Sequence, residues 1–85
     1  MTEQRRQLRG YILRNFLFSE DEAALSDSGS LIAEGVIDST GVLELIMFLE
    51  ETFGIQVAEE EMVPENLDSV DRILAFLRRK SSAPE

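Results

Sequence analysis

The residues with the clearest chemical potential are Asp38 and Ser39, which stand where a segment rich in serine and glycine gives way to a periodic apolar one. Both residue types are favoured as helix caps, so a purely structural role explains the two residues locally. A serine hydroxyl at a helix N-terminus can also carry an anionic substituent, because the unpaired N–H groups and the helix dipole favour a phosphate there. An ordinary phosphorylation site fits the same position. The residues themselves therefore leave three interpretations open, a cap, a phosphorylation site and an attachment site.

Composition makes an enzymatic role for this serine a poor hypothesis. The chain has 85 residues with no histidine and no cysteine, and no lysine lies near Ser39 in the sequence to activate its hydroxyl. The same absences exclude zinc sites of the usual ligand types. An EF-hand loop built around Gly29 is excluded as well, because Ala24 and Gly35 would then occupy the first and last ligand positions. We expect a protein that is not an enzyme and holds no metal.

The charge is unevenly distributed along the chain. Seventeen acidic and 8 basic side chains give a net charge of −9, yet residues 18–68 contain fourteen acidic side chains and no basic one. This composition opposes binding to nucleic acid and to anionic membrane surfaces. A simple gain in solubility would explain it, but a concentration of acids also favours a basic protein partner. No apolar run is long enough to cross a bilayer and the first residues lack a secretory signal, so we expect a cytoplasmic protein, and a monomer.

Apolar periodicity predicts three main helices and no strand. The first covers residues 2–17, with Thr2 as its N-cap and an apolar face formed by Leu8, Tyr11, Ile12 and Phe16. A long loop follows over residues 18–37, held to the core by Leu31, Ile32, Val36 and Ile37. The second helix covers residues 39–53, with a core face of Val42, Leu45, Ile46, Leu49 and Phe53. Gly54 should end it and Ile55 should fold back onto it.

The remainder of the chain is expected to add one short and one long helical segment. Residues 58–63 should form one helical turn, which Pro64 stops. Asp68 is the predicted N-cap of the last helix, which buries Val70, Ile73, Leu74 and Leu77 and ends in Arg78, Arg79 and Lys80. The prediction is a single all-α domain over residues 1–80 with a flexible tail over residues 81–85.

The second helix should present a mixed apolar and acidic surface to solvent. With its core stripe turned inward, the outward positions are Leu43, Glu44, Met47, Phe48 and Glu51, with Glu50 at the margin. Exposed Leu and Met among carboxylates suit a protein partner better than they suit solubility. For Phe48, cover by another part of the chain is as good an expectation as exposure.

The region from Gly35 to Val57 resembles the signature of acyl carrier proteins and the related peptidyl carrier domains. The shared features are the Asp-Ser dipeptide, Glu-Leu one turn later and the ending Leu-Glu-Glu-x-Phe-Gly, in order and spacing. The order of helices and the long first loop extend the match over roughly residues 4–79. The resemblance implies a four-helix bundle with three main helices, one short helix and a long first loop.

The resemblance also implies a function. Ser39 would receive 4′-phosphopantetheine from coenzyme A through a separate Mg2+-dependent phosphopantetheinyl transferase, with Asp38 beside it in the cofactor site. The arm's thiol would hold an acyl or aminoacyl group as a thioester, so the chain would need no cysteine of its own. Docking to basic patches on partner enzymes would then be assigned to Leu43, Glu44, Met47, Glu50 and Glu51.

Two departures from the common pattern point away from the housekeeping carrier of fatty-acid synthesis. Thr40 stands where a leucine usually follows the serine, and Gly41 comes next. The lead-in Glu-Gly-Val-Ile-Asp-Ser is more similar to stand-alone carriers served by a dedicated adenylating ligase, including the D-alanyl carrier type. The alternative is an acidic helical adaptor that is never modified and binds a basic protein.

Overall fold

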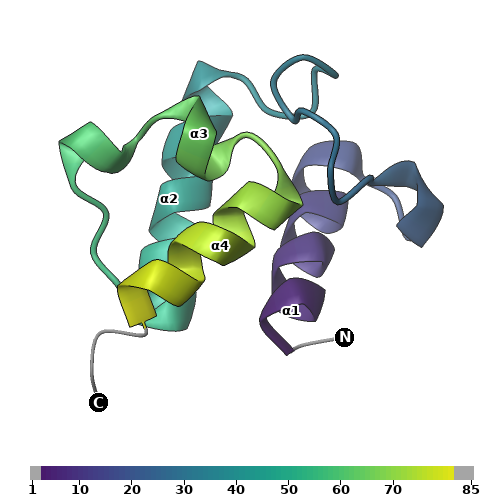
Figure 1. The fold of residues 1–85 in the computed structure, drawn as a ribbon. Helices are drawn as coiled ribbons and strands as arrows, with labels where there is room; N and C mark the ends of the chain where they lie inside the picture. The colour runs from purple at the N-terminus through teal and green to yellow at the C-terminus, as the bar shows by residue number, and fades with distance from the viewer. Residues whose placement is uncertain (1–2, 82–85) are drawn as a thin grey trace.

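The elements of the chain are all helical, as predicted, and no strand occurs within residues 3–81, which the computed structural model describes (Figure 1). The four α-helices are α1 (Glu3–Ile12), α2 (Ser39–Phe53), α3 (Pro64–Leu67) and α4 (Val70–Ser81). Three single-turn helices join them, η1 (Leu13–Leu17), η2 (Glu22–Ala24) and η3 (Glu59–Glu61). Thr2 and residues 82–85 of the predicted tail lie outside the described residues. In Figure 1, α4 runs obliquely in front of α2, and its first turn lies toward α1.

The first predicted helix changes geometry near its end. Beyond Ile12 the chain continues as the π-helical turn η1 and stops at Phe18, whose backbone is left-handed with φ 51° and ψ 45°. The carbonyl of Leu13 accepts hydrogen bonds from the N–H groups of both Phe18 and Ser19, the latter at 3.0 Å. The wider π turn therefore ends in a closed backbone structure rather than a frayed one.

Helix α2 has the bounds that its apolar periodicity predicts. Gly54 ends it with a φ of 68°, a left-handed conformation that glycine adopts without steric cost. Beyond it, half-buried Ile55 packs against the core as expected. The helix is thus fixed at both ends, and Ser39 is its first residue.

The prediction for residues 58–63 is only partly right. A helical turn forms there, but as the three-residue 3-10 helix η3, and the one short α-helix, α3, comes later among the described residues. Pro64 begins α3 as its first residue instead of merely stopping the preceding turn. Proline suits the first helical position because its fixed φ is already helical and its missing N–H would have no helical partner.

The predicted N-cap of the last helix is wrong by one residue. The Ser69 hydroxyl caps α4 by accepting a hydrogen bond from the N–H of Arg72 at 3.0 Å. Asp68 holds the long loop instead, because its carboxylate accepts from the Ser30 hydroxyl at 2.6 Å and from the N–H of Ile32 at 2.9 Å. The Asp68 carboxylate therefore binds the long loop, although the local sequence pattern predicted that it would cap α4.

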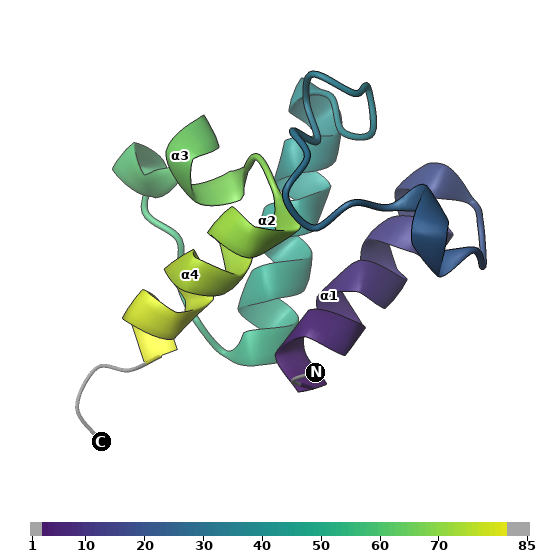
Figure 2. The same cartoon turned by 45° about the vertical axis from the view of Figure 1, so that its right-hand side comes forward.

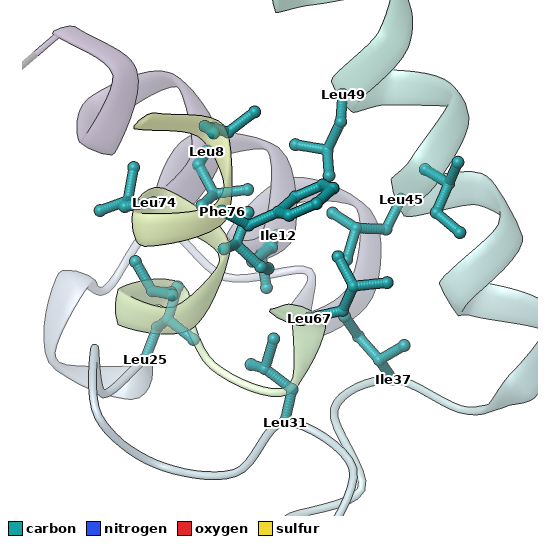
Figure 3. Packing of buried hydrophobic residues seen from close by; sticks show 14 of the residues in the cluster. Leu8, Ile12, Leu25, Leu31, Ile37, Leu45, Leu49, Leu67, Leu74 and Phe76 are labelled. Carbon is teal, nitrogen blue, oxygen red and sulfur yellow. The ribbon is translucent and has the colours of Figure 1, made fainter. Parts of the chain in front are cut away.

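A single apolar core joins the helices and the loop (Figure 3). Most of the predicted core residues are buried, and Phe76, Leu67 and Leu25 join them although the periodicity did not single them out. The ring of Phe76 lies in the middle of the cluster in Figure 3. Ile32, expected to hold the loop to the core, is 48% exposed, and that role falls to buried Leu31 and Ile37 with half-buried Val36.

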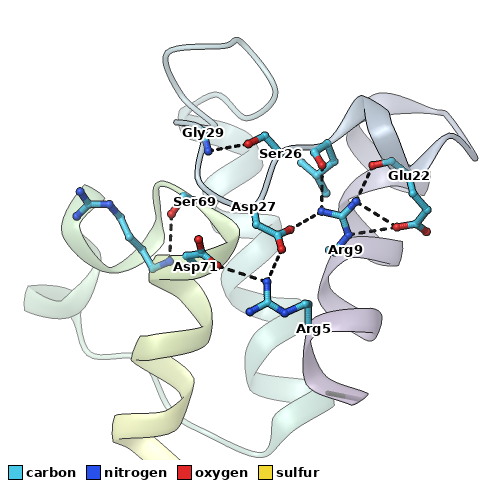
Figure 4. A network of polar contacts seen from close by, with 10 residues as sticks. Arg5, Arg9, Glu22, Ser26, Asp27, Gly29, Ser69 and Asp71 are labelled. Carbon is cyan, nitrogen blue, oxygen red and sulfur yellow. Dashed lines mark hydrogen bonds and ion pairs between the residues drawn. The ribbon is translucent and has the colours of Figure 1, made fainter. Parts of the chain in front are cut away.

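Ion pairs fasten the long loop to α1, and a backbone hydrogen bond fastens it to α4 (Figure 4). The guanidinium of buried Arg9 donates to the carbonyls of Leu25 at 3.0 Å and Glu22 at 2.6 Å, and it pairs with the carboxylates of Glu22 and Asp27. Asp27 also pairs with Arg5, and its carbonyl accepts from the N–H of Asp71 at 2.9 Å. Burial alone would lower the pKa of Arg9, but hydrogen bonds to Asp27 and Glu22 outweigh it and raise that pKa. The loop is thus held by directed contacts as well as by apolar packing.

Candidate functional site

Ser39 and Asp38 lie at the exposed N-terminus of α2. Asp38 is the N-cap, and its Oδ1 accepts a hydrogen bond from the N–H of Gly41 at 2.7 Å. The cap interpretation is therefore correct for Asp38. Ser39 follows it with an exposed side chain whose hydroxyl makes no hydrogen bond within residues 3–81. The cap requires only Asp38, so the serine hydroxyl is available for chemistry.

Gly41 allows η1 to pack against the first turn of α2. A Cβ at this position would lie 2.8 Å from Cε1 of Phe16, and 3.3 Å from both Asp38 Oδ1 and Ile37 Cγ2. The glycine that weakens the helix by propensity is thus explained by the close approach of an aromatic ring. The contact places the end of η1 beside the helix start that carries Ser39.

A groove of about 310 Å³ opens beside Ser39. It lies between the start of α2, the end of the long loop and α3, which stands in front of the first half of α2 in Figure 1. The side chains of its wall are mainly apolar, and exposed Ile32 and Met62 contribute to it. The lining residues are Ile32, Asp38, Ser39, Val42, Met62, Val63, Pro64 and Leu67. A chain attached to the Ser39 hydroxyl could lie along this groove, with its polar end at the helix N-terminus.

The outward face of α2 carries the apolar and acidic surface expected from the sequence. Leu43 and Met47 are each 58% exposed, and Glu44 and Glu51 are exposed with them. Glu50 differs from these four, because it is half-buried and its Oε2 accepts a hydrogen bond from the N–H of Val57 at 3.0 Å. One of its carboxylate oxygens therefore already serves the fold.

Phe48 is covered rather than exposed, by an aromatic contact with α1. Its ring stacks on Tyr11 with centroids 4.0 Å apart and planes 9° from parallel, and it meets Phe53 edge to face at 5.9 Å. The Tyr11 hydroxyl donates to the carbonyl of Glu44 at 3.2 Å. Burial and the negative charge of Glu44 raise the pKa of Tyr11.

The structure adds residues that the sequence did not assign to the site. Tyr11 lines a second hollow of about 280 Å³ together with Glu44, Met47, Phe48 and Glu51, so α1 contributes to the outward face. Met62 and Pro64 line the groove beside Ser39, because α3 turns back toward α2. The local sequence feature that could have indicated α3 is Pro64, because proline favours the first position of a helix as well as ending the preceding one. Within residues 3–81 no cluster of acidic side chains has the arrangement of a metal site, and no helix there is long and apolar enough to cross a membrane.

Comparison with known proteins gives a consistent set of relatives. No protein-family model matches the chain. It is similar to the D-alanyl carrier protein of Abiotrophia defectiva, with 34% identity over 65 residues that cover 75% of this chain and 82% of the relative. The D-alanyl carrier protein of Streptococcus uberis is 36% identical over 67 residues, covering 79% of this chain and 84% of the relative. That of Streptococcus pyogenes is 40% identical over 58 residues, covering 68% and 72%.

Proposed function

The chain belongs to the carrier protein family of the D-alanyl carrier proteins, and from this premise we propose that it carries an aminoacyl or acyl group as a thioester on 4′-phosphopantetheine attached to Ser39. It is a carrier and not an enzyme. The observation that carries the proposal is the exposed Ser39 hydroxyl at the first residue of α2, next to an apolar groove. The names of the relatives make D-alanine the first cargo to test. The pathway is then a specialised one, separate from housekeeping fatty-acid synthesis.

The residues around Ser39 fit the proposed cofactor. The first N–H groups of α2 and the positive end of its dipole favour the phosphate, while Asp38 holds the helix start in place. Val42, Val63 and Leu67 offer apolar surface along the groove to the attached arm. When bound, the group supplies the thiol that carries the cargo, which is the function that a chain without cysteine cannot supply itself.

The outward face of α2 is the proposed docking surface for partner enzymes. It consists of Leu43, Glu44, Met47 and Glu51, with Glu50 at its margin. These acids would meet basic side chains, which speed association and fix orientation more than they add affinity. The partners are a phosphopantetheinyl transferase with coenzyme A and Mg2+, an adenylating ligase, and enzymes that use the cargo. A cytoplasmic monomer stays the prediction for the protein itself.

The attachment is tested by intact mass. Purified protein is incubated with coenzyme A, Mg2+ and a broad-specificity phosphopantetheinyl transferase, and its mass should increase by one phosphopantetheine group. Ser39→Ala should gain nothing, whereas Thr40→Ala, which removes the neighbouring exposed hydroxyl, should be modified like the wild type. An unchanged mass of the wild type, or modification that persists in Ser39→Ala, would overturn the proposal.

The cargo and the alternative function are tested separately. The modified protein, supplied with ATP, D-alanine and a D-alanine-adenylating ligase, should acquire a thioester that hydroxylamine cleaves. The unmodified acidic adaptor predicts a different pattern in cells, in which Ser39→Ala preserves function and charge reversal at Glu44 and Glu51 abolishes it. A carrier, in contrast, loses its function in cells when Ser39 is replaced by alanine.

A further inference from the structure

Phe18 has an exposed apolar side chain and an unfavourable backbone conformation. It is 82% exposed, more than any other large apolar side chain in the described part of the chain. Its backbone is also left-handed, with φ 51° and ψ 45°, a conformation in which residues other than glycine, asparagine and aspartate are uncommon. An exposed aromatic ring gains little from folding, so burial does not offset the backbone strain.

The local structure does not call for a phenylalanine here. The backbone N–H of Phe18 donates to the carbonyl of Leu13 and closes η1, a contact that every residue except proline can make. Glycine would adopt the same φ without the steric cost. Neither the turn nor the core explains the ring, and backbone strain of this kind at a bulky residue clusters at binding and other functional sites.

Phe18 lies at the same end of the molecule as Ser39. Phe16, two residues before it, packs against Gly41, which is two residues after Ser39. Figures 1 and 2 agree that the end of η1 and the start of α2 share one end of the bundle. Two residues of chain span at most about 7 Å, so Phe18 and Ser39 lie within roughly 20 Å of each other.

This distance favours the enzyme that acts on the serine itself. A standard interface covers about 800 Å² of each partner, a patch roughly 30 Å across, so one interface can include both the Ser39 hydroxyl and Phe18 when Ser39 lies away from its centre. An enzyme that acts at the far end of a flexible arm has no such constraint. On balance the surface next to the ring is acidic, since Glu20, Asp21 and Glu22 are exposed and Arg14 is the single basic residue among residues 13–34.

From these observations we propose that Phe18 inserts into an apolar pocket, bordered by basic side chains, on the phosphopantetheinyl transferase that modifies Ser39. The inference rests on the proposed function. It adds to the docking face of α2 a second contact point at the end of η1. An aromatic anchor in a desolvated pocket is the kind of residue that dominates binding energy in protein interfaces.

The test is a comparison of transferase kinetics and stability in four proteins: wild type, Phe18→Gly, Phe18→Tyr and Gln56→Ala. Phe18→Gly removes the ring and the backbone strain together. Its KM as a substrate should rise about five- to tenfold with kcat unchanged, while its urea midpoint stays equal to or above that of the wild type. Phe18→Tyr restores the ring and should recover most of the KM. Gln56→Ala alters an exposed residue beyond the far end of α2 and should leave KM unchanged.

The possible results separate this inference from the proposed function. A KM for Phe18→Gly within about twofold of the wild type would overturn the inference and leave carrier function intact. A lower urea midpoint for Phe18→Gly would also overturn it, because the ring would then serve the fold. If the wild type itself is never modified, the proposed function fails, and the inference fails with it.

Discussion

Replacing Gly41 by alanine tests the packing that brings η1 against the start of α2. In a free helix, alanine is favoured over glycine by about 1 kcal/mol. Here the new Cβ would lie 2.8 Å from Cε1 of Phe16, well inside the separation of roughly 3.5–4.0 Å at which carbon atoms attract. The ring has little freedom to retreat, because it also meets Tyr11 edge to face at 5.7 Å.

The two effects oppose each other, and the steric one should be larger. An extra methyl group in a packed site costs about 1–3 kcal/mol, against the gain of about 1 kcal/mol in helix propensity. The expected net change is a loss of about 1 kcal/mol in the free energy of unfolding. For a domain of this size that loss lowers Tm by about 4–8 °C.

Urea denaturation followed by circular dichroism measures the change. Thr40→Ala is the matched control, because it alters the next residue of the same helix turn at an exposed position and should be neutral or slightly stabilising. In a Phe16→Leu background the smaller side chain should remove most of the cost of Gly41→Ala. If Gly41→Ala instead stabilises the wild-type protein by the full propensity gain, Phe16 does not lie where the structure places it.

Three further perturbations test other contacts. Asp38→Ala removes the cap of α2 and should cost about 1 kcal/mol in urea denaturation, whereas Asp38→Asn, which can still cap, should cost less. Arg9→Met leaves the carbonyls of Leu25 and Glu22 without their side-chain donor and should cost about 1–3 kcal/mol, with faster hydrogen exchange in residues 22–31 and little rescue by Arg9→Lys. The pKa of Glu61 is lowered by the N–H of Ala58 and by Lys80, so its ionised form stabilises the fold. That contribution is lost as pH falls through the lowered pKa, below 4.5, and the urea midpoint of Glu61→Gln should therefore fall less steeply there than that of the wild type.

Local signals were sufficient for α2 and for the position of Ser39. The helix has a continuous apolar stripe, a capping residue before it and Gly54 after it, and all three act over neighbouring residues. The resemblance to carrier proteins is what favours one role for Ser39. The residues alone are compatible with a cap, a phosphorylation site or an attachment site.

Long-range contacts account for what the sequence did not reveal. Asp68 is a good local cap, but Ser30 and Ile32 compete for its carboxylate from 36 or more positions away, and Ser69 takes the cap. The burial of Arg9 likewise depends on Asp27 and on loop carbonyls that no periodic pattern brings together. Helix α3 is too short to show periodicity, so its part in the groove beside Ser39 becomes visible only in the fold.

The stacking of Tyr11 on Phe48 gives the protein an internal optical reporter. Tyr11 is the only tyrosine of the chain, which has no tryptophan, so tyrosine fluorescence comes from a single residue at the contact between α1 and α2. Its raised pKa delays formation of the phenolate in alkaline solution for as long as that contact persists. Emission and alkaline titration of the isolated, unlabelled protein can therefore follow the contact between α1 and α2, before and after modification of the protein.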